Sequence, residues 1–249
     1  MIGTAELLQH LDELLQTGSF DDYCPNGLQV EGRPTVASLA VAVTASLAVI
    51  EQARDEQCDA LLVHHGFFWK GEDPRVVGPK RARLAALLGA GINLVAYHLP
   101  LDRHPQLGNN ARLAARLGWS VDGTGGPQGL IAWTDLAEPR DARWLAAGLA
   151  TALDRDPLLV GNLERPIRRL AWCTGGAQDY LAAAAALRAD AFVSGEISER
   201  TTHEARERGL IYAAAGHHAT ERYGVQAVAE HLAARFGLHT RFIDDPNPA

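Results

Sequence analysis

Short apolar runs alternate with alanine-rich segments along most of this chain, and this alternation most restricts its fold. The runs of strand length fall near residues 39–44, 60–63, 93–97, 130–133, 170–174, 191–194 and 211–215. Segments with helical periodicity fill most of the gaps, at 79–89, 109–117, 141–153, 177–188 and 219–235. Strands that alternate with helices are typical of βα units. The sequence therefore predicts an α/β fold.

A glycine-rich stretch, GTGGPQG at 123–129, is the best candidate for a domain boundary, because clustered glycine and proline interrupt regular structure. We predict an N-terminal α/β domain over 1–125 and a C-terminal α/β domain over 126–249, with the C-terminal helix free to pack back on the first domain.

The two predicted halves also echo each other. The dipeptide Leu-Ala opens a run at residue 39 and again at residue 170, and in both halves Asp-Ala follows 20 residues later. The offset of 131 residues between the halves places His65 opposite Glu196, so polar groups would follow the same strand in each half. The echo has two interpretations, a duplication that gives two similar domains or a chance match of a few residues.

Charge and composition argue against several classes of protein. A net charge of −7 offers no basic excess to neutralise phosphates, which argues against a nucleic-acid-binding protein. The N-terminal stretch mixes acids with apolar residues, unlike a signal peptide, and no stretch approaches the roughly 20 apolar residues of a membrane span. Cys24, Cys58 and Cys173 lie far apart and form no CxxC, which argues against disulfides and against a cysteine zinc site. We expect a cytoplasmic protein without a membrane partner.

Three histidine-bearing segments, VHHG, YHLPLD and AGHHATE, each follow a predicted strand. Ligands of open α/β sheets bind at the carboxyl ends of strands, so these side chains are expected within mutual reach. A lone strand-end histidine is more often a surface or hydrogen-bonded residue, whereas two HH pairs after strands predict a metal site. The candidate residues are His64, His65, His98, Asp102, His217, His218 and Glu221.

Spacing adds two details to this prediction. His217 and Glu221 are four residues apart, so they share one face of a helix that begins there. His64 and His65 would point to opposite faces of a regular strand. Both can serve one site only where the strand ends and the chain turns, at Gly66.

Six motifs occur in a fixed order: NGLQVEG at 26–32, VHHGFFWKGE at 63–72, YHLPLD at 97–102, CTGGAQ at 173–178, SGE at 194–196 and GHHATER at 216–222. Through them the chain resembles the GTP cyclohydrolase 1 type 2 homologue family, also called NIF-three-like, from about residue 20 to the C-terminus. The resemblance implies the compact bacterial form, with two α/β domains that face each other and a dinuclear metal site at strand ends between them. It also implies a homo-oligomer, a toroidal hexamer.

The resemblance implies a ligand set of His64, His65, Asp102, His217 and Glu221 for two divalent metal ions per chain. Three nitrogen and two oxygen ligands suit zinc, iron, manganese or nickel. Such ions lower the pKa of bound water and attract anionic or carbonyl oxygens, which makes hydrolysis the expected reaction class. The expected substrate is a small molecule, a nucleotide or cyclic amide such as GTP. The alternative is a non-catalytic metal-binding protein with a regulatory, metal-handling or scaffold role.

Three further features have two interpretations each. His98 and His218 lie outside the ligand set, and either transfer protons in catalysis or are packed, hydrogen-bonded residues. The glycine pair Gly175-Gly176 either offers backbone N–H groups to an anion such as a phosphate or only permits a tight turn. The aromatic run FFW at 67–69 is expected in the core or in a subunit interface, since contiguous exposed aromatics are rare in soluble monomers.

Overall fold

The computed structural model describes residues 1–249, and the chain divides into two compact units. Unit 1 comprises Met1–Leu101 with Gly224–Pro246, and unit 2 comprises Asp102–Tyr223 with Asn247–Ala249. The chain passes from unit 1 to unit 2 within helix α4 (Leu99–Arg103) and returns within helix α9 (His217–Phe236). None of the helices is long and apolar enough to cross a membrane.

Unit 1 is built on a five-stranded sheet with the order β13-β4-β5-β6-β2. The strands β13, β4, β5 and β6 run parallel, and β2 pairs antiparallel with β6 at one edge. Their bounds are β2 Gly27–Val30, β4 Ser38–Thr44, β5 Ala60–His65, β6 Asn93–Ala96 and β13 His239–Phe242. A short antiparallel pair, β1 (Ile2–Gly3) and β3 (Thr35–Val36), forms a separate two-stranded sheet.

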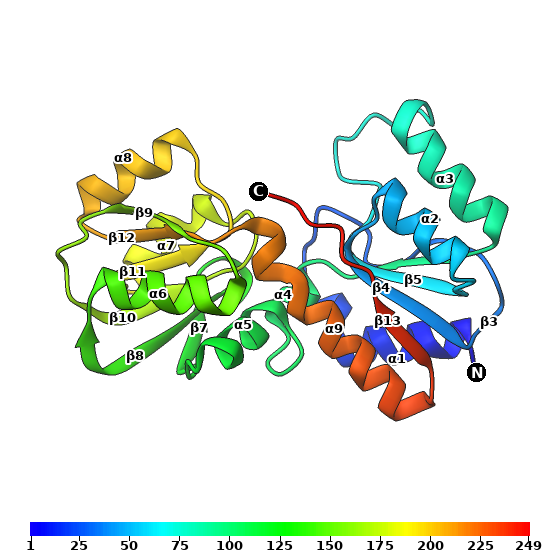
Figure 1. Cartoon of the computed structure of the whole chain (residues 1–249), viewed down its shortest axis with the longest axis horizontal. Helices are drawn as coiled ribbons and strands as arrows, with labels where there is room; N and C mark the ends of the chain where they lie inside the picture. The colour runs from blue at the N-terminus through cyan, green and yellow to red at the C-terminus, as the bar shows by residue number, and fades with distance from the viewer. The chain divides into compact units, whose positions relative to one another are not determined.

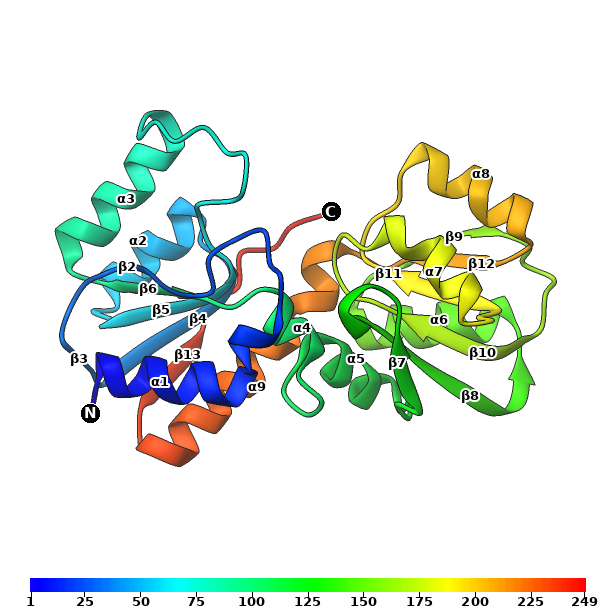
Figure 2. The same cartoon turned by 180° about the vertical axis from the view of Figure 1, so that it is seen from behind.

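Helices cover both faces of the unit 1 sheet, as Figures 1 and 2 show. Helices α2 (Leu47–Asp55) and α3 (Gly78–Ala90) lie on one face, where Ile50 and Leu87 join Leu61 in a buried cluster. Helix α1 (Thr4–Leu15) and the later turns of α9 lie on the other face. The central strands β4, β5 and β6 are largely apolar because both of their faces are buried, as is usual for parallel sheets.

Unit 2 is built on a six-stranded sheet with the order β7-β8-β10-β11-β12-β9. The strands β10, β11 and β12 are parallel, and β8 and β9 flank them as antiparallel neighbours. The bounds are β7 Gly123–Gly125, β8 Ile131–Arg140, β9 Leu158–Gly161, β10 Ile167–Trp172, β11 Ala191–Ser194 and β12 Ile211–Ala214.

Helices α5 (Asn109–Leu117) and α6 (Ala142–Leu153) cover one face of this sheet, and α7 (Leu181–Ala186) and α8 (Glu199–Arg208) cover the other (Figures 1 and 2). Leu113 of α5 and Leu149 of α6 pack with Trp172 in the main buried cluster of this unit. Three-residue 3-10 turns complete the chain as η1 Thr17–Ser19, η2 Pro127–Gly129 and η3 Gln178–Tyr180.

The two units repeat one arrangement of strands, which confirms the prediction of two similar α/β domains. In unit 1, Leu39 of β4 is in register with Ala60 of β5. In unit 2, Leu170 of β10 is in register with Ala191 of β11. In both sheets the next parallel strand is followed by an antiparallel edge strand, β2 or β9.

The division between the units differs from the boundary expected between 1–125 and 126–249. The glycine-rich stretch contains β7, which pairs with β8 inside the unit 2 sheet. Helix α5 contributes Leu113 to the core of the same unit, so residues 102–125 belong to unit 2. The stretch is therefore a hairpin within a sheet, and residues 224–246 complete unit 1.

Candidate metal centre

Three histidines of unit 1 gather where β5 and β6 end. A ring nitrogen of each of His64, His65 and His98 lies within 4.8 Å of the others. Strand β5 extends through both His64 and His65, yet their ring centroids are 4.6 Å apart, so the two rings lie together although they follow one another in a strand. This group could hold a metal ion through its imidazole nitrogens.

The tautomer of His64 is fixed by its surroundings. Its Nδ1 lies 3.0 Å from the carbonyl oxygen of Tyr97, and a carbonyl can only accept, so Nδ1 carries the proton. The Nε2 of a neutral ring then keeps its lone pair, which is the form that binds metals. The His64 side chain is fully buried, whereas His65 is partly exposed, and its Nδ1 lies 3.1 Å from the hydroxyl oxygen of Thr44.

His98 is held by a carboxylate. Its Nδ1 donates to Oδ1 of Asp22 at 2.9 Å, and its backbone N–H donates to Asn26, which itself donates to Asp22 at 3.0 Å. Burial raises the pKa of Asp22, but the bonds from His98, Asn26 and the Leu99 N–H outweigh burial and lower this pKa to about 2. Asp22 is therefore ionised, and it holds the proton of His98 on Nδ1.

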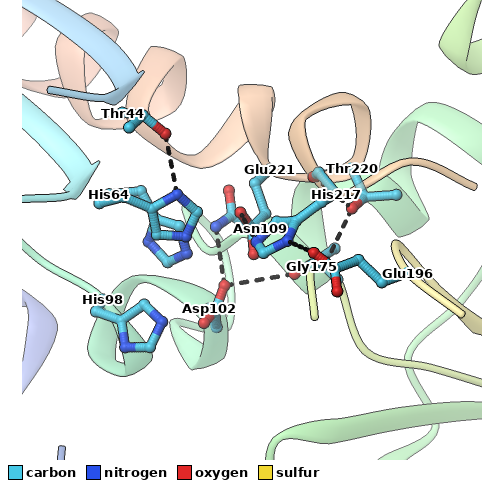
Figure 3. Close-up of polar contacts among 12 residues, drawn as sticks. Thr44, His64, His98, Asp102, Asn109, Gly175, Glu196, His217, Thr220 and Glu221 are labelled. Atoms are coloured by element: carbon cyan, nitrogen blue, oxygen red, sulfur yellow. Dashed lines mark hydrogen bonds and ion pairs between the residues drawn. The ribbon is translucent and has the colours of Figure 1, made fainter. Parts of the chain in front are cut away.

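Asp102 is the first unit 2 residue after the chain leaves unit 1, and its carboxylate is buried, with 6% of the residue exposed. Asn109 donates to its Oδ1 at 2.9 Å and the Thr174 hydroxyl at 3.4 Å (Figure 3). Neither donor is a charged group. These two hydrogen bonds orient the carboxyl group of Asp102.

Glu221 lies one turn into α9 and is 3% exposed. A carboxylate oxygen of Glu221 lies within 4.8 Å of one of Asp102. Gly175 makes this position possible, since a Cβ at Gly175 would lie 1.8 Å from Oε1 of Glu221. The backbone of Gly175 has φ +70°, and its N–H donates to the Thr220 hydroxyl at 3.0 Å (Figure 3). A glycine is required here by both the close approach and the conformation.

His217 stands between two carboxylates. Its Nδ1 donates to Oε1 of Glu196 at 2.7 Å, and its Nε2 lies 3.1 Å from Oε2 of Glu221. Burial lowers the pKa of His217, but the hydrogen bond and charge of Glu221, followed by those of Glu196, outweigh it and raise the pKa to about 9. The surroundings of Nε2 therefore stabilise positive charge, which a proton or a metal ion can supply.

The donor set of unit 2 suits a divalent metal ion. Two buried carboxyl groups with oxygens within 4.8 Å can both ionise only where positive charge lies close to them, which a protonated His217 supplies in part and a divalent metal ion would supply in full. One imidazole and two carboxylates, with further neutral donors around them, match the ligands of zinc, manganese and iron. The side chains present here therefore fit a metal ion.

The sequence also matches a known family model over residues 3–248, nearly the whole chain. The chain belongs to the Duf34/NIF3 (NGG1p interacting factor 3) family. Curated relatives named GTP cyclohydrolase 1 type 2 homolog support this assignment. The chain is 51% identical to one from Pseudomonas aeruginosa over 100% of this chain and 99% of the relative. It is 49% identical to one from Escherichia coli over 98% of each.

Solved structures of similar proteins have the same fold. The structure of protein ybgI matches with a TM-score of 0.95 and 48% identity over 100% of both chains. A protein of Thermus thermophilus matches with a TM-score of 0.90 and 39% identity, again over 100% of both chains. HcgD of Methanocaldococcus jannaschii shares the fold alone, with a TM-score of 0.86 at 23% identity over 98% of each chain.

The predicted site residues of this Duf34/NIF3 protein divide between unit 1 and unit 2. His64, His65 and His98 form the histidine group of unit 1, and Asp102, His217 and Glu221 form the carboxylate group of unit 2. His218, in the first turn of α9, is partly exposed and is not among the side chains with clustered ligand atoms. Consecutive helix residues point about 100° apart, which separates His218 from His217.

The sequence prediction missed four residues that orient the candidate ligands: Asp22, Asn109, Thr174 and Glu196. Only Glu196 could have been found from the sequence, because the offset of 131 residues between the two halves places it opposite His65. The others act on partners 7 to 76 residues away along the chain, which spacing alone does not reveal.

One glycine of the pair Gly175-Gly176 already has a protein partner for its N–H group. The N–H of Gly175 donates to the Thr220 hydroxyl, and the N–H of Ala177 donates to the Ser194 hydroxyl at 3.1 Å. The segment that follows is the 3-10 turn η3, not the start of a long helix. The N–H groups at 175 and 177 are therefore already occupied by protein acceptors.

Proposed function

We propose that this chain is a dinuclear metal-dependent hydrolase whose two divalent ions are held by His64, His65, Asp102, His217 and Glu221. The observation that carries the proposal is the buried carboxylate pair, Asp102 and Glu221, with oxygens within 4.8 Å and exposures of 6% and 3%. Buried like charges are costly unless a cation joins them. The tautomer of His64 supports the same proposal, since a proton on Nδ1 leaves the lone pair of the neutral ring on Nε2.

The chemistry of such a centre is general. A divalent metal ion lowers the pKa of bound water and polarises carbonyl or phosphoryl oxygens. The side chains of this protein would hold the metal ligands in position and transfer protons. Glu196 holds the proton of His217 on Nδ1, so that Nε2 is directed to Glu221. In the same way Asp22 holds the proton of His98 on Nδ1, and Nε2, which lies 3.5 Å from the Tyr23 hydroxyl, is the nitrogen that would exchange a proton with a substrate.

The proposed substrates are small molecules with a hydrolysable cyclic amide or phosphate bond, and GTP is the first to test. The names of the curated relatives support GTP as a starting point. The protein should be purified without a metal-binding tag, its metal content measured by elemental analysis, and formate release from GTP followed. We expect metal on the protein, loss of turnover on chelation and recovery when metal is returned.

Two variants separate catalysis from metal binding. His98→Gln and His218→Gln should keep the metal content of the parent, because the proposed ligand set takes only His64 and His65 from the histidine group of unit 1 and does not include His218. A proton-transfer residue contributes on the order of 10²-fold or more to turnover, so the loss should be of that size. Metal-loaded protein that is inactive toward nucleotides, cyclic amides and phosphoesters would contradict the hydrolase and favour a metal-binding regulatory, metal-handling or scaffold protein.

We also propose that the chain forms a homo-oligomer, a hexamer by family resemblance. Large apolar side chains on and before α3 support an interface there, since Val76, Val77 and Leu88 are 50%, 59% and 63% exposed. Of the aromatic run, Phe67 is 4% exposed and belongs to the core, whereas Phe68 is 39% exposed. Light scattering at micromolar concentration checks the assembly, and a mass near 26.8 kDa, that of one chain, would contradict it.

A further inference from the structure

Two aromatic side chains, Tyr23 and Trp69, stand beside the histidine group of unit 1 and are called here the aromatic wall. Their ring centroids are 5.6 Å apart, with planes tilted by 36°. Both rings meet His98 edge to face, with centroids 4.9 Å apart for Tyr23 and 5.2 Å apart for Trp69. Trp69 also approaches His65, with centroids 6.1 Å apart. The wall therefore adjoins the imidazoles that the proposed function uses.

The wall is fixed by contacts of its two loops. The backbone N–H of Lys70 donates to the carbonyl oxygen of Tyr23 at 2.7 Å, which joins the loop before β2 to the loop after β5. Phe67 anchors the second loop, because its side chain is buried and its N–H donates to Gln29 at 2.6 Å. The position of Trp69 is thus set by the backbone on both sides of the wall.

The backbone at Phe68 is strained. Its φ is +66°, a left-handed conformation that is unfavourable for a bulky side chain. This turn separates Phe67, which points into the core, from Trp69, which lies with the histidines. Such strain persists only where the surrounding structure over-determines it, and it is most common at binding and active sites.

The wall is also partly open to solvent, since Tyr23 is 52% exposed and Trp69 is partly exposed. A protein that only needed to pack its histidines would gain more from covering these rings than from exposing them. Partly exposed aromatic side chains next to polar, proton-carrying groups suit a ligand with a flat apolar ring and a polar reacting edge. Stacking on aromatic side chains is the usual way in which proteins hold such rings.

We propose that Tyr23 and Trp69 bind the planar nitrogen-containing ring of the substrate by stacking, and so select heteroaromatic substrates such as nucleosides and their derivatives. This inference rests on the proposed function, because it names the substrate class of that site. The ring lies against the wall, and its polar edge faces His65 and His98. Tyr23 and Trp69 are binding residues in this proposal and hold no metal.

The test is equilibrium binding of guanosine and uridine, with ribose as the probe that lacks a planar ring. We expect the parent protein to bind the nucleosides and not ribose. Trp69→Ala and Tyr23→Leu should weaken nucleoside binding by about 5- to 100-fold, the range for one lost stacking partner. Phe20→Leu is the matched control, because Phe20 is an aromatic residue on the same segment as Tyr23 and has no ring contact with the histidines. It should bind like the parent.

Trp69→Phe keeps a ring and decides whether stacking is the cause. It should retain most of the nucleoside affinity, whereas the nucleoside-dependent quenching of Trp69 fluorescence should disappear. Unchanged affinity in Trp69→Ala and Tyr23→Leu, loss of affinity in Trp69→Phe, or a parent that binds neither nucleoside would each overturn the proposal. The metal content of the parent and of every variant is measured by elemental analysis, so that the two proposals can fail separately. A parent protein that contains no metal would contradict the proposed hydrolase, but it would not contradict stacking of the nucleoside on Tyr23 and Trp69.

Discussion

Asp59 and Asp190 accept equivalent hydrogen bonds at corresponding places in the two sheets. Oδ2 of Asp59 accepts the N–H groups of Ala37 and Ser38 at 2.9 and 3.0 Å. Oδ2 of Asp190 accepts those of Arg168 and Arg169 at 2.8 and 2.9 Å. Each aspartate also uses Oδ1 for an arginine, Arg33 at 2.6 Å in unit 1 and Arg165 in unit 2. One carboxylate thus joins the start of two parallel strands in each unit.

This pair predicts how stability depends on acid. Burial raises the pKa of Asp59, but the hydrogen bonds from Ser38, Ala37 and Arg33 outweigh it and lower the pKa below its ordinary 3.8. A carboxyl with a lowered pKa in the folded state stabilises the protein above pH 3.8, and this contribution is lost as the pH falls through the lowered value. Asp59→Asn should cost about 1–3 kcal/mol at pH 7 and less at pH 3.

Urea denaturation at the two pH values measures this difference, and Asp190→Asn should behave in the same way. Asp55→Asn is the control, because the Asp55 side chain is 67% exposed and its ion pair with Arg54 lies at the surface. It should change the free energy of unfolding by less than about 0.5 kcal/mol. A cost for Asp59→Asn that grows toward pH 3 would contradict the prediction.

Removal of proposed ligands should release metal without unfolding the chain. His64→Ala, Asp102→Ala and Glu221→Ala each delete one donor, and the metal content per chain should fall in all three. Circular dichroism should show that the fold persists. His203→Ala is the matched histidine control, since its side chain is 60% exposed and lies on α8. If all three ligand variants keep the metal content of the parent, the ligand assignment is wrong.

Gly175 provides a steric test of the Glu221 position. Gly175→Ala places a Cβ 1.8 Å from Glu221 Oε1, so the carboxylate must move and the metal content should fall. Gly118→Ala is the control, because Gly118 has the same φ of +70° and a Cβ added there would meet no atom within 4 Å. Both variants should lose about 1–2 kcal/mol from the left-handed conformation. Only Gly175→Ala should lose metal, and equal metal content in the two would refute the steric account.

Metal binding should release a proton from His217. Its pKa of about 9 means that the ring is protonated at pH 7.5 without metal, and a histidine ligand must be neutral. Calorimetric titration of metal-free protein in buffers of different ionisation enthalpy should therefore show release of about one proton from this group at pH 7.5. The release should decline above pH 9, and it should be smaller in Glu196→Gln, which removes one source of the raised pKa. A binding enthalpy that is the same in all buffers would contradict this.

The central strands and long helices could be predicted because their signals are local. The helix predicted over 109–117 is α5 with the same bounds, and the strand predicted over 191–194 is β11. The edge strands β2, β7, β9 and β13 were not predicted, because sequences such as HTRF are only partly apolar. They are strands through pairing with a neighbour, which is a property of the tertiary structure.

The candidate metal ligands could also be predicted from local sequence signals, whereas the residues around them could not. Two HH pairs after apolar runs indicated metal ligands, and the structure places both pairs where strands β5 and β12 end. The residues that orient these ligands could not be found in this way. Asp22 meets His98 across 76 positions of sequence, and Glu196 meets His217 across 21. Contacts of this kind depend on how loops fold back, which no residue pattern encodes.

Unit 1 is formed by two separate segments of the chain, and this affects the order in which the two units can fold during synthesis. Residues 102–223 form one continuous run, whereas β13 and most of α9 come from the last part of the chain. On the ribosome, unit 2 can fold once its own run has emerged, and N-terminal segments generally fold first. In this chain the sheet of unit 1 cannot be completed first, because β4 pairs with β13, and β13 is synthesised only after residues 102–223. Until then the edge of β4 lacks its strand partner, and we expect newly made unit 1 to be more prone to pair with other chains than unit 2.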